Sequence, residues 1–254
     1  PTAMAPLKLA RLSGRPDIAD VLESAGAESP DLTSAEKLRS ALMSADGAGA
    51  QAILDGHPDL RADAPVTRWM HMAAGAGRHA AVKTMIDLEF PVEVPGQDAP
   101  LHAAAYAGDM DMARLLIAAG ADTTLRDPTH NGPPLGFAMF ANQSEMVQFL
   151  LTQPMDIFAA AWVGKTDVLA SLVADQPNLL NARFTTVRQN TEACPDDWKT
   201  PLAVAVTDGQ TETAAWLLQA GADPTVTDPD GRSIRDIGLA SDSPDIRALF
   251  GEQR

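Results

Sequence analysis

The stretch that decides the fold runs from Pro100 to Asp127 and reads PLHAAAYAGDMDMARLLIAAGADTTLRD. Small residues after Leu101 allow a first helix to pack closely, and Gly108 has the conformational freedom needed where a helix ends. A second apolar run follows, and Gly-Ala-Asp at residues 120–122 supplies another helix stop and a turn. The stretch therefore predicts two short helices joined by a tight turn.

This unit recurs along the whole chain of 254 residues, which is best seen from the apolar residue that opens each first helix, here called the anchor. The gaps between successive anchors are 31, 32, 31, 34, 22, 45 and 32 residues, and the two odd gaps together span two ordinary ones. The sixth copy is thus displaced from the regular spacing, but its helical pattern is kept. The anchors are Leu7, Leu38, Met70, Leu101, Leu135, Ile157, Leu202 and Ile234.

Two recurring positions, the seventh and the tenth residues after the anchor, explain how each unit folds. The seventh carries residues that tolerate a left-handed backbone: Gly14, Gly77, Gly108, Asn142, Gly164 and Gly209. The tenth carries an acid that the start of a second helix favours through its free amide groups and its dipole: Asp17, Asp111, Glu145, Asp167 and Glu212. These spacings predict a helix-turn-helix in nearly every copy.

The pattern Pro-Leu-His-x-Ala-Ala-x-x-Gly at residues 100–108, followed by Leu-Leu-x-x-Gly-Ala-Asp, resembles the ankyrin-repeat family. The resemblance implies an all-α ankyrin-repeat solenoid of about eight helix-turn-helix repeats with short β-turn fingers. Repeats that end in Pro-Asp-Leu at 58–60 or Pro-Asn-Leu at 177–179 resemble a bacterial variant. We expect one array over 1–254, with repeats at 1–30, 31–63, 64–94, 95–127, 128–154, 155–183, 198–228 and 229–254, and an inserted loop at 184–197.

Composition narrows the class of protein further. No run approaches 18 apolar residues and no charged-then-apolar leader opens the chain, so we expect a cytoplasmic protein with no membrane association. The net charge of -15 opposes binding to nucleic acid and favours, if anything, a basic partner. Many of the acids are nevertheless explained by helix starts and turns. A single cysteine, Cys194, excludes internal disulfides and a thiolate zinc site, and we expect neither metal nor cofactor.

No motif for catalysis or phosphate binding occurs in the sequence, so we expect a non-catalytic protein. His71 and His102 occupy the signature histidine position, where the resemblance implies a structural bridge between adjoining repeats. The resemblance also implies that a partner protein binds the concave face, to which the fifth residue after the anchor points. Three successive repeats place aromatic rings there, namely Tyr106, Phe140 and Trp162. Burial of these rings between irregular repeats is the alternative.

Other candidates for partner contact come from the same face and from the long loop. They are Met43, Arg126, His130, Trp198 and Arg188. The loop that holds Arg188 and Cys194 is either functional or a tolerated insertion. Cys194 lies between acids and has no basic neighbour to activate its thiol.

A second hypothesis from a different class remains open. The phase slip between Leu135 and Leu202 could deepen the concave face into a pocket, giving an enzyme or small-molecule receptor with contacts from Arg126, His130, Arg183 and Trp198. A closed cavity favours this hypothesis, and an open groove favours protein docking. The first anchor lies six residues from Pro1, which fits both a natural start and a segment of a longer polypeptide. The pattern leaves the oligomeric state open.

Overall fold

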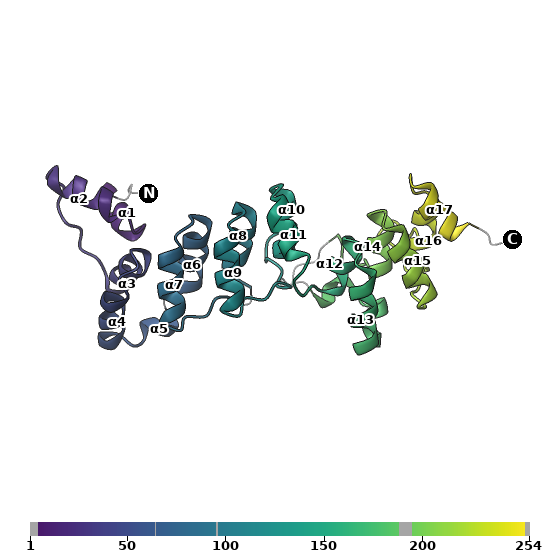
Figure 1. Cartoon of the computed structure of the whole chain (residues 1–254), viewed down its shortest axis with the longest axis horizontal. Coiled ribbons are helices and arrows are strands. Elements are labelled where there is room, and N and C mark those ends of the chain that lie inside the picture. Colours follow the sequence, from purple (N-terminus) through teal and green to yellow (C-terminus); the bar gives the residue numbers. More distant parts are fainter. Residues whose placement is uncertain (1–4, 64, 95, 188–194, 252–254) are drawn as a thin grey trace. The chain divides into compact units, whose positions relative to one another are not determined.

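The computed structural model describes residues 5–63, 65–94, 96–187 and 195–251. Within these residues it contains 17 α-helices and two 3-10 helices, and an isolated antiparallel bridge between Thr227 and Ser233. Short helices follow one another as hairpins joined by turns (Figure 1). This confirms the predicted all-α ankyrin-type architecture. None of the helices in the described ranges is long and apolar enough to cross a membrane.

The chain divides into two compact units, Pro1–Thr152 and Gln153–Arg254. Unit 1 holds five helical hairpins, in which α6 packs on α8 and α8 packs on α10. Its helices are α1 (Pro6–Leu12), α2 (Pro16–Ser24), α3 (Ser34–Met43), α4 (Gly47–Gly56), α5 (Leu60–Asp63), α6 (Val66–Gly75), α7 (His79–Asp87), α8 (Pro100–Ala107), α9 (Met110–Ala118), α10 (Pro134–Phe140) and α11 (Ser144–Leu150).

Unit 2 holds three hairpins, in which α12 packs on α14 and α14 packs on α16. Its helices are α12 (Ile157–Trp162), α13 (Thr166–Asp175), η1 (Pro177–Asn181), η2 (Phe184–Thr186), α14 (Pro201–Thr207), α15 (Thr211–Gln219), α16 (Ile234–Leu239) and α17 (Pro244–Phe250). The Pro-Asp-Leu repeat end leads into the short helix α5, and the Pro-Asn-Leu repeat end lies within η1. The division of the eight repeats into one continuous array stays a prediction.

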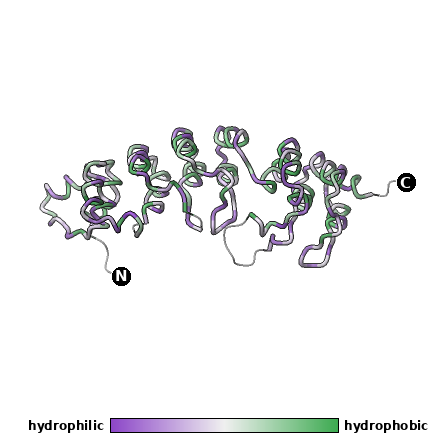
Figure 2. The backbone as a smooth tube through the Cα atoms, turned by 90° about the horizontal axis from the view of Figure 1, so that it is seen from below, coloured by the Kyte–Doolittle hydropathy of each residue, from purple (hydrophilic) through white to green (hydrophobic). Residues whose placement is uncertain are grey.

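All eight anchors are buried, with at most 4% of any anchor exposed to solvent. Hydrophobic and hydrophilic residues alternate along most helices (Figure 2), which bury one side and expose the other, whereas α12 and α14 are buried almost throughout. Burial of the anchors between packed helices within each unit supplies the main driving force, at roughly 25 cal/mol per Å² of apolar surface. Packing between neighbouring repeats therefore holds each unit together.

The turn after the first helix takes a left-handed conformation in seven of the eight repeats, all but the last. Backbone φ is positive at the seventh position after the anchor in six predicted cases, from 56° at Asn142 to 75° at Gly164. A seventh case is Ala45, with φ of 62°, where the second repeat has no glycine. The alanine bears a steric cost that glycine avoids.

A side chain from the next hairpin fixes the end of several first helices. In unit 1 the Gln143 Nε2 donates to the Tyr106 carbonyl oxygen at 3.1 Å. In unit 2 the Gln210 Nε2 donates to the Trp162 carbonyl oxygen at 2.8 Å. Arg78 occupies the same position in the third repeat and donates to the carbonyl oxygens of Met43 and Gly14. These inter-repeat bonds satisfy helix C-terminal carbonyls that have no partner within the helix.

Candidate functional site

An open hollow lies where α8 and α10 end beside the turn that joins the fourth repeat to the fifth. Its volume is about 420 Å³. We call it the aromatic groove, and its lining residues are Tyr106, His130, Gly132, Gly136, Phe137 and Phe140. Three aromatic rings and an imidazole thus surround two glycines, which place no side chain in the space between them.

Tyr106 and Phe140 form the open wall of the groove. Tyr106 is 52% exposed and Phe140 is 80% exposed. Their rings stack with centroids 6.4 Å apart and planes inclined by 28°. Each ring stands at the fifth position after its anchor, at the end of a first helix, and the Gln143 bond ties the Tyr106 carbonyl to the turn between α10 and α11. The two rings are therefore presented side by side by a fixed backbone.

Phe137 forms the inner wall and joins the groove to a neighbouring hollow. Its ring meets the His130 imidazole edge-to-face at 5.9 Å and the His102 imidazole at 5.0 Å. The second hollow has a volume of about 220 Å³ and shares Tyr106 and Phe137 with the groove. Its other lining residues are His71, Gly75, His102, Ala103 and Ala107. An apolar depression thus continues from the third repeat to the fifth.

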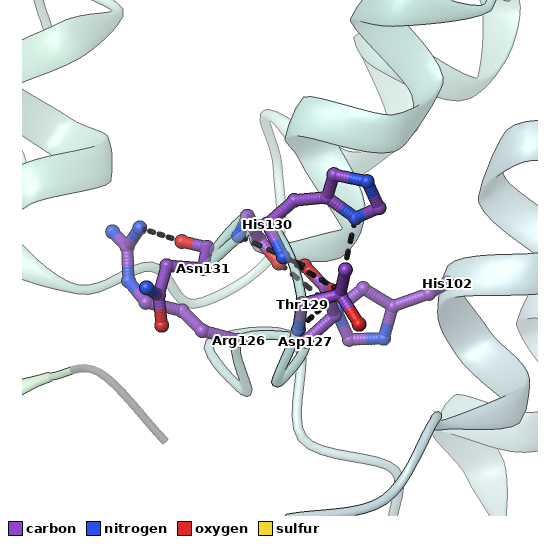
Figure 3. A network of polar contacts seen from close by, with 7 residues as sticks. His102, Arg126, Asp127, Thr129, His130 and Asn131 are labelled. Carbon is purple, nitrogen blue, oxygen red and sulfur yellow. Dashed lines mark hydrogen bonds and ion pairs between the residues drawn. The ribbon is translucent and has the colours of Figure 1, made fainter. Parts of the chain in front are cut away.

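The turn at residues 127–132 carries His130 into the groove and is held by one carboxylate (Figure 3). Asp127 accepts hydrogen bonds from the backbone N–H groups of Thr129, His130 and Gly132, at 3.0 to 3.1 Å. The His130 Nδ1 lies 3.1 Å from the same carboxylate. The backbone N–H groups organise the turn around a buried acid, and His130 is held at the groove by its own bond to that acid.

The charge of Asp127 is favoured by these bonds. Burial raises the pKa of its carboxyl, but the N–H groups of His130, Gly132 and Thr129 outweigh burial, so the net pKa is below its ordinary value. Asp127 therefore stays ionised directly behind His130. A fixed negative charge lies at the back of the groove.

His102 and His71 are structural, as predicted. The His102 Nε2 bonds to the Gly132 carbonyl oxygen at 3.1 Å, and the His71 Nδ1 bonds to the Ala99 carbonyl oxygen at 3.1 Å. Each imidazole thereby bridges its first helix to the next repeat. Burial lowers the pKa of His102 and outweighs the effects of the Gly132 carbonyl and the Asp127 charge.

The structure places two of the predicted contact residues inside the fold. Met43 and Arg126 are each 5% exposed. Gly14 packs directly against Met43, and Arg78 reaches over both carbonyls. The Arg126 guanidinium donates to the Asn131 carbonyl oxygen at 2.7 Å and supports the turn from within. Neither side chain is available to a partner, so we omit both from the proposed surface.

The other predicted residues lie outside the groove or outside the described part of the chain. Trp162 and Trp198 belong to unit 2, where both are half-buried. The Arg183 guanidinium donates to the Trp198 carbonyl oxygen at 2.7 Å and closes the base of the inserted loop. Arg188 and Cys194 fall outside the described residues.

Sequence reasoning missed Phe137, Gly136 and Gln143. Phe137 stands two residues after its anchor, where the fourth and sixth repeats carry Ala103 and Ala159. An aromatic ring at this position, which no other repeat has, is the signal that could have identified it. Gln143 has no sequence signal of its own, since its role depends on a carbonyl in the preceding repeat.

Comparison with known proteins places the chain in a family. A model of three ankyrin repeats matches residues 70–161, and a single ankyrin-repeat model matches residues 197–229. No curated protein matches the chain. Among solved structures, the Bd0816 predatory endopeptidase from Bdellovibrio bacteriovorus in complex with immunity protein Bd3460 is similar at 19% identity, with a TM-score of 0.45, over 73% of this chain and 97% of that chain.

The human ASB11 ankyrin repeat domain is similar at 17% identity, with a TM-score of 0.43, over 97% of this chain and 96% of that chain. The family models match four of the repeats that the anchors, the left-handed turns and the bridging histidines define. The chain is an ankyrin-repeat protein.

Proposed function

We propose that this chain is a non-catalytic protein-interaction module and that a partner protein binds it at the aromatic groove. The observation that carries the proposal is the stacked pair Tyr106 and Phe140, which is exposed although each ring is large and apolar. Aromatic rings supply large contact areas at low entropic cost and are enriched among the residues that dominate binding energy. An exposed apolar cluster on a folded protein commonly marks a binding site.

The groove is open, which favours a protein partner over a small molecule. Both rings of its outer wall are more than half exposed. Small-molecule sites bury most of a ligand's surface, whereas this wall leaves one side of any occupant in solvent. The groove also lies between the fourth and fifth repeats, one interval before the phase slip at which the small-molecule hypothesis places a pocket. That hypothesis gains no support from the groove.

The chemistry of the lining residues also favours binding over catalysis. Tyr106 and His130 are the only groups of the lining that can transfer a proton, and His130 is bonded to Asp127. The Asp127 carboxylate is occupied by several N–H groups and serves the turn. Within the described ranges, no group of three or more His, Cys, Asp or Glu side chains is placed to hold a metal ion.

The experiment that tests the proposal is affinity capture from the source organism with three baits. The parent chain is compared with the double variant Tyr106→Ala/Phe140→Ala and with Val21→Ala. Val21 is a matched control, because it is apolar, 68% exposed and located on α2, away from the groove. Circular dichroism must show that all three are folded. We expect one protein to be retained by the parent and by Val21→Ala and lost by the double variant.

Equal capture by all three baits would contradict the proposal. Loss of the partner by both variants would show that capture depends on general surface hydrophobicity. Trp162→Ala is a further useful bait, because Trp162 lies in unit 2 and its part in binding remains a prediction from the sequence.

A further inference from the structure

The aromatic groove is lined by the rings of Tyr106, Phe137 and Phe140, and the face of such a ring attracts a positive charge. The face of an aromatic ring is electronegative, so a cation within about 6 Å of the ring centroid is stabilised. This chain makes the same contact internally. The Arg114 guanidinium carbon lies 4.5 Å from the Phe149 ring centroid, and that of Arg61 lies 5.4 Å from the Phe90 centroid. Phe140 has an exposed ring and lies in a groove lined by Tyr106 and Phe137.

The charges around the groove favour a cationic occupant as well. Residues 100–152 contain five carboxylates and only two arginines, Arg114 and Arg126, besides His102 and His130. Neither arginine is available to the groove, because Arg114 lies over Phe149 and Arg126 is buried with the Asn131 carbonyl. No lysine occurs between Lys83 and Lys165. The buried Asp127 carboxylate lies 3.1 Å from the Nδ1 of His130, which lines the groove.

We propose that the partner protein inserts an arginine side chain, carried on an exposed basic segment, into the aromatic groove beside Phe140. This inference rests on the proposed function and specifies the chemistry of the partner. Arginine fits better than lysine because its planar guanidinium stacks on rings and is more weakly hydrated than an ammonium group. The groove volume of about 420 Å³ suits one long side chain with its adjoining backbone, not a whole helix.

Tyr106 allows a direct test, because it is the only tyrosine in the chain and lines the groove. Protein labelled with ¹³C in the tyrosine ring gives one set of ring signals in NMR spectra. Short peptides Gly-Ser-X-Ser-Gly, acetylated and amidated at their ends, are titrated with X as arginine, lysine, citrulline or norleucine. Citrulline keeps the shape of arginine without its charge, and norleucine keeps only the apolar stem.

We expect the arginine peptide to shift the Tyr106 signals in a saturable way and to bind about threefold to thirtyfold more tightly than the citrulline peptide, the range that cation–π contacts give. Phe140→Leu keeps apolar bulk but removes the ring, so this preference should fall to about onefold. Val21→Ala should leave it unchanged.

Two results would overturn the inference. Equal affinity of the arginine and citrulline peptides, or tighter binding of norleucine, would show that the groove takes an apolar side chain. Absence of any shift at millimolar concentrations of the arginine peptide would show that the groove does not select it. In both cases the proposed function is still supported if the double variant Tyr106→Ala/Phe140→Ala fails to capture a partner that the parent chain captures. Failure of the arginine inference is therefore distinguishable from failure of the proposed function.

Discussion

The ends of α8 in unit 1 and α12 in unit 2 share one framework and carry different surfaces. In both, a glycine with positive φ ends the turn, 71° at Gly108 and 75° at Gly164, and a glutamine of the next hairpin binds a carbonyl of the first helix. On α8 that carbonyl belongs to Tyr106, which stacks on the exposed Phe140. On α12 it belongs to the half-buried Trp162, and the corresponding residue of the next repeat is Thr207. The framework therefore fixes the backbone at the fifth position after the anchor, whereas the adjoining repeat determines whether the ring at that position is exposed to a partner.

The largest expected effect concerns the glycine of this framework. A Cβ on Gly164 would lie 2.5 Å from the Gln210 Oε1, whereas a Cβ on Gly209, which also has positive φ, would meet nothing within 4 Å. Gly209→Ala should therefore cost about 1 kcal/mol of unfolding free energy for its backbone conformation alone. Gly164→Ala should cost about 2 kcal/mol, because it also disturbs the glutamine bond. Urea unfolding of the full chain measures both.

The reverse substitution sharpens the same comparison. Ala45 has a positive φ in the second repeat, so Ala45→Gly should raise the unfolding free energy by up to about 1 kcal/mol. A decrease in stability would show that the left-handed turns do not carry the cost assigned to them.

Removing the rings of Phe140 and Trp162, which occupy equivalent positions, should distinguish an exposed ring from a packed one by the loss of unfolding free energy. Phe140→Ala should change the unfolding free energy by less than about 0.5 kcal/mol, because the ring is 80% exposed. Trp162→Ala should cost about 1 to 2 kcal/mol, because this side chain is half-buried. Thermal unfolding followed by circular dichroism measures both. A larger loss for Phe140→Ala than for Trp162→Ala would reverse the assignment of exposed and packed rings.

The glutamine bonds should have similar and smaller effects in the two units. Gln143→Ala and Gln210→Ala should each cost about 1 kcal/mol, the usual value of one hydrogen bond. Only Gln143→Ala should also weaken partner binding, because it loosens the backbone of Tyr106 without removing a ring. Equal loss of binding in both variants would contradict a surface confined to unit 1.

The smallest effect that we expect is a pH dependence caused by a histidine, which only unit 1 can show. All five histidines lie between residues 57 and 130, so unit 2 has none. Burial lowers the pKa of His102 in the folded state. As pH falls below about 6.5, the unfolded chain binds a proton that the folded chain does not, and unit 1 loses stability until the lower folded pKa is reached. Above about 6.5 the effect is absent.

Hydrogen exchange of the amides in α8 and in α15, corrected for intrinsic exchange rates, reports the stability of each unit separately. The two stabilities are compared between about pH 7.5 and about pH 5.5. His102→Gln should reduce the pH dependence in α8. Glu93 acts in the opposite direction, because burial raises its pKa and its protonation favours folding at low pH. Comparing the parent with His102→Gln isolates the histidine. An unchanged pH dependence in that variant would contradict the account.

The repeat framework was predictable because its causes are local. The anchors are apolar wherever a first helix packs on its neighbour, and all eight are buried. Glycine or asparagine at the seventh position marks turns whose φ is positive. Ala45 was not predictable, since alanine gives no sign of a left-handed backbone. The turn there follows from the packing of the helices on both sides.

The groove was predictable only in part, because it depends on contacts between repeats. The fifth position after the anchor identified Tyr106 and Phe140, but the same rule selected Met43, which Gly14 and Arg78 cover. Phe137 was missed because the rule considers only the fifth position, and Phe137 lies at the second. Arg126 looked available in sequence, yet its guanidinium binds a backbone carbonyl within the turn. Exposure at a given position is therefore a property of two repeats together.

Site-specific photo-crosslinking in the source organism tests the central claim most directly. Phe140, Trp162 and Val21 are each replaced, one at a time, by p-benzoylphenylalanine in the full chain. We expect one protein to be crosslinked from position 140 and not from position 21, and we expect Tyr106→Ala to weaken this product. A protein crosslinked from position 162 alone, or equally from position 21, would contradict the claim that the partner binds at the aromatic groove.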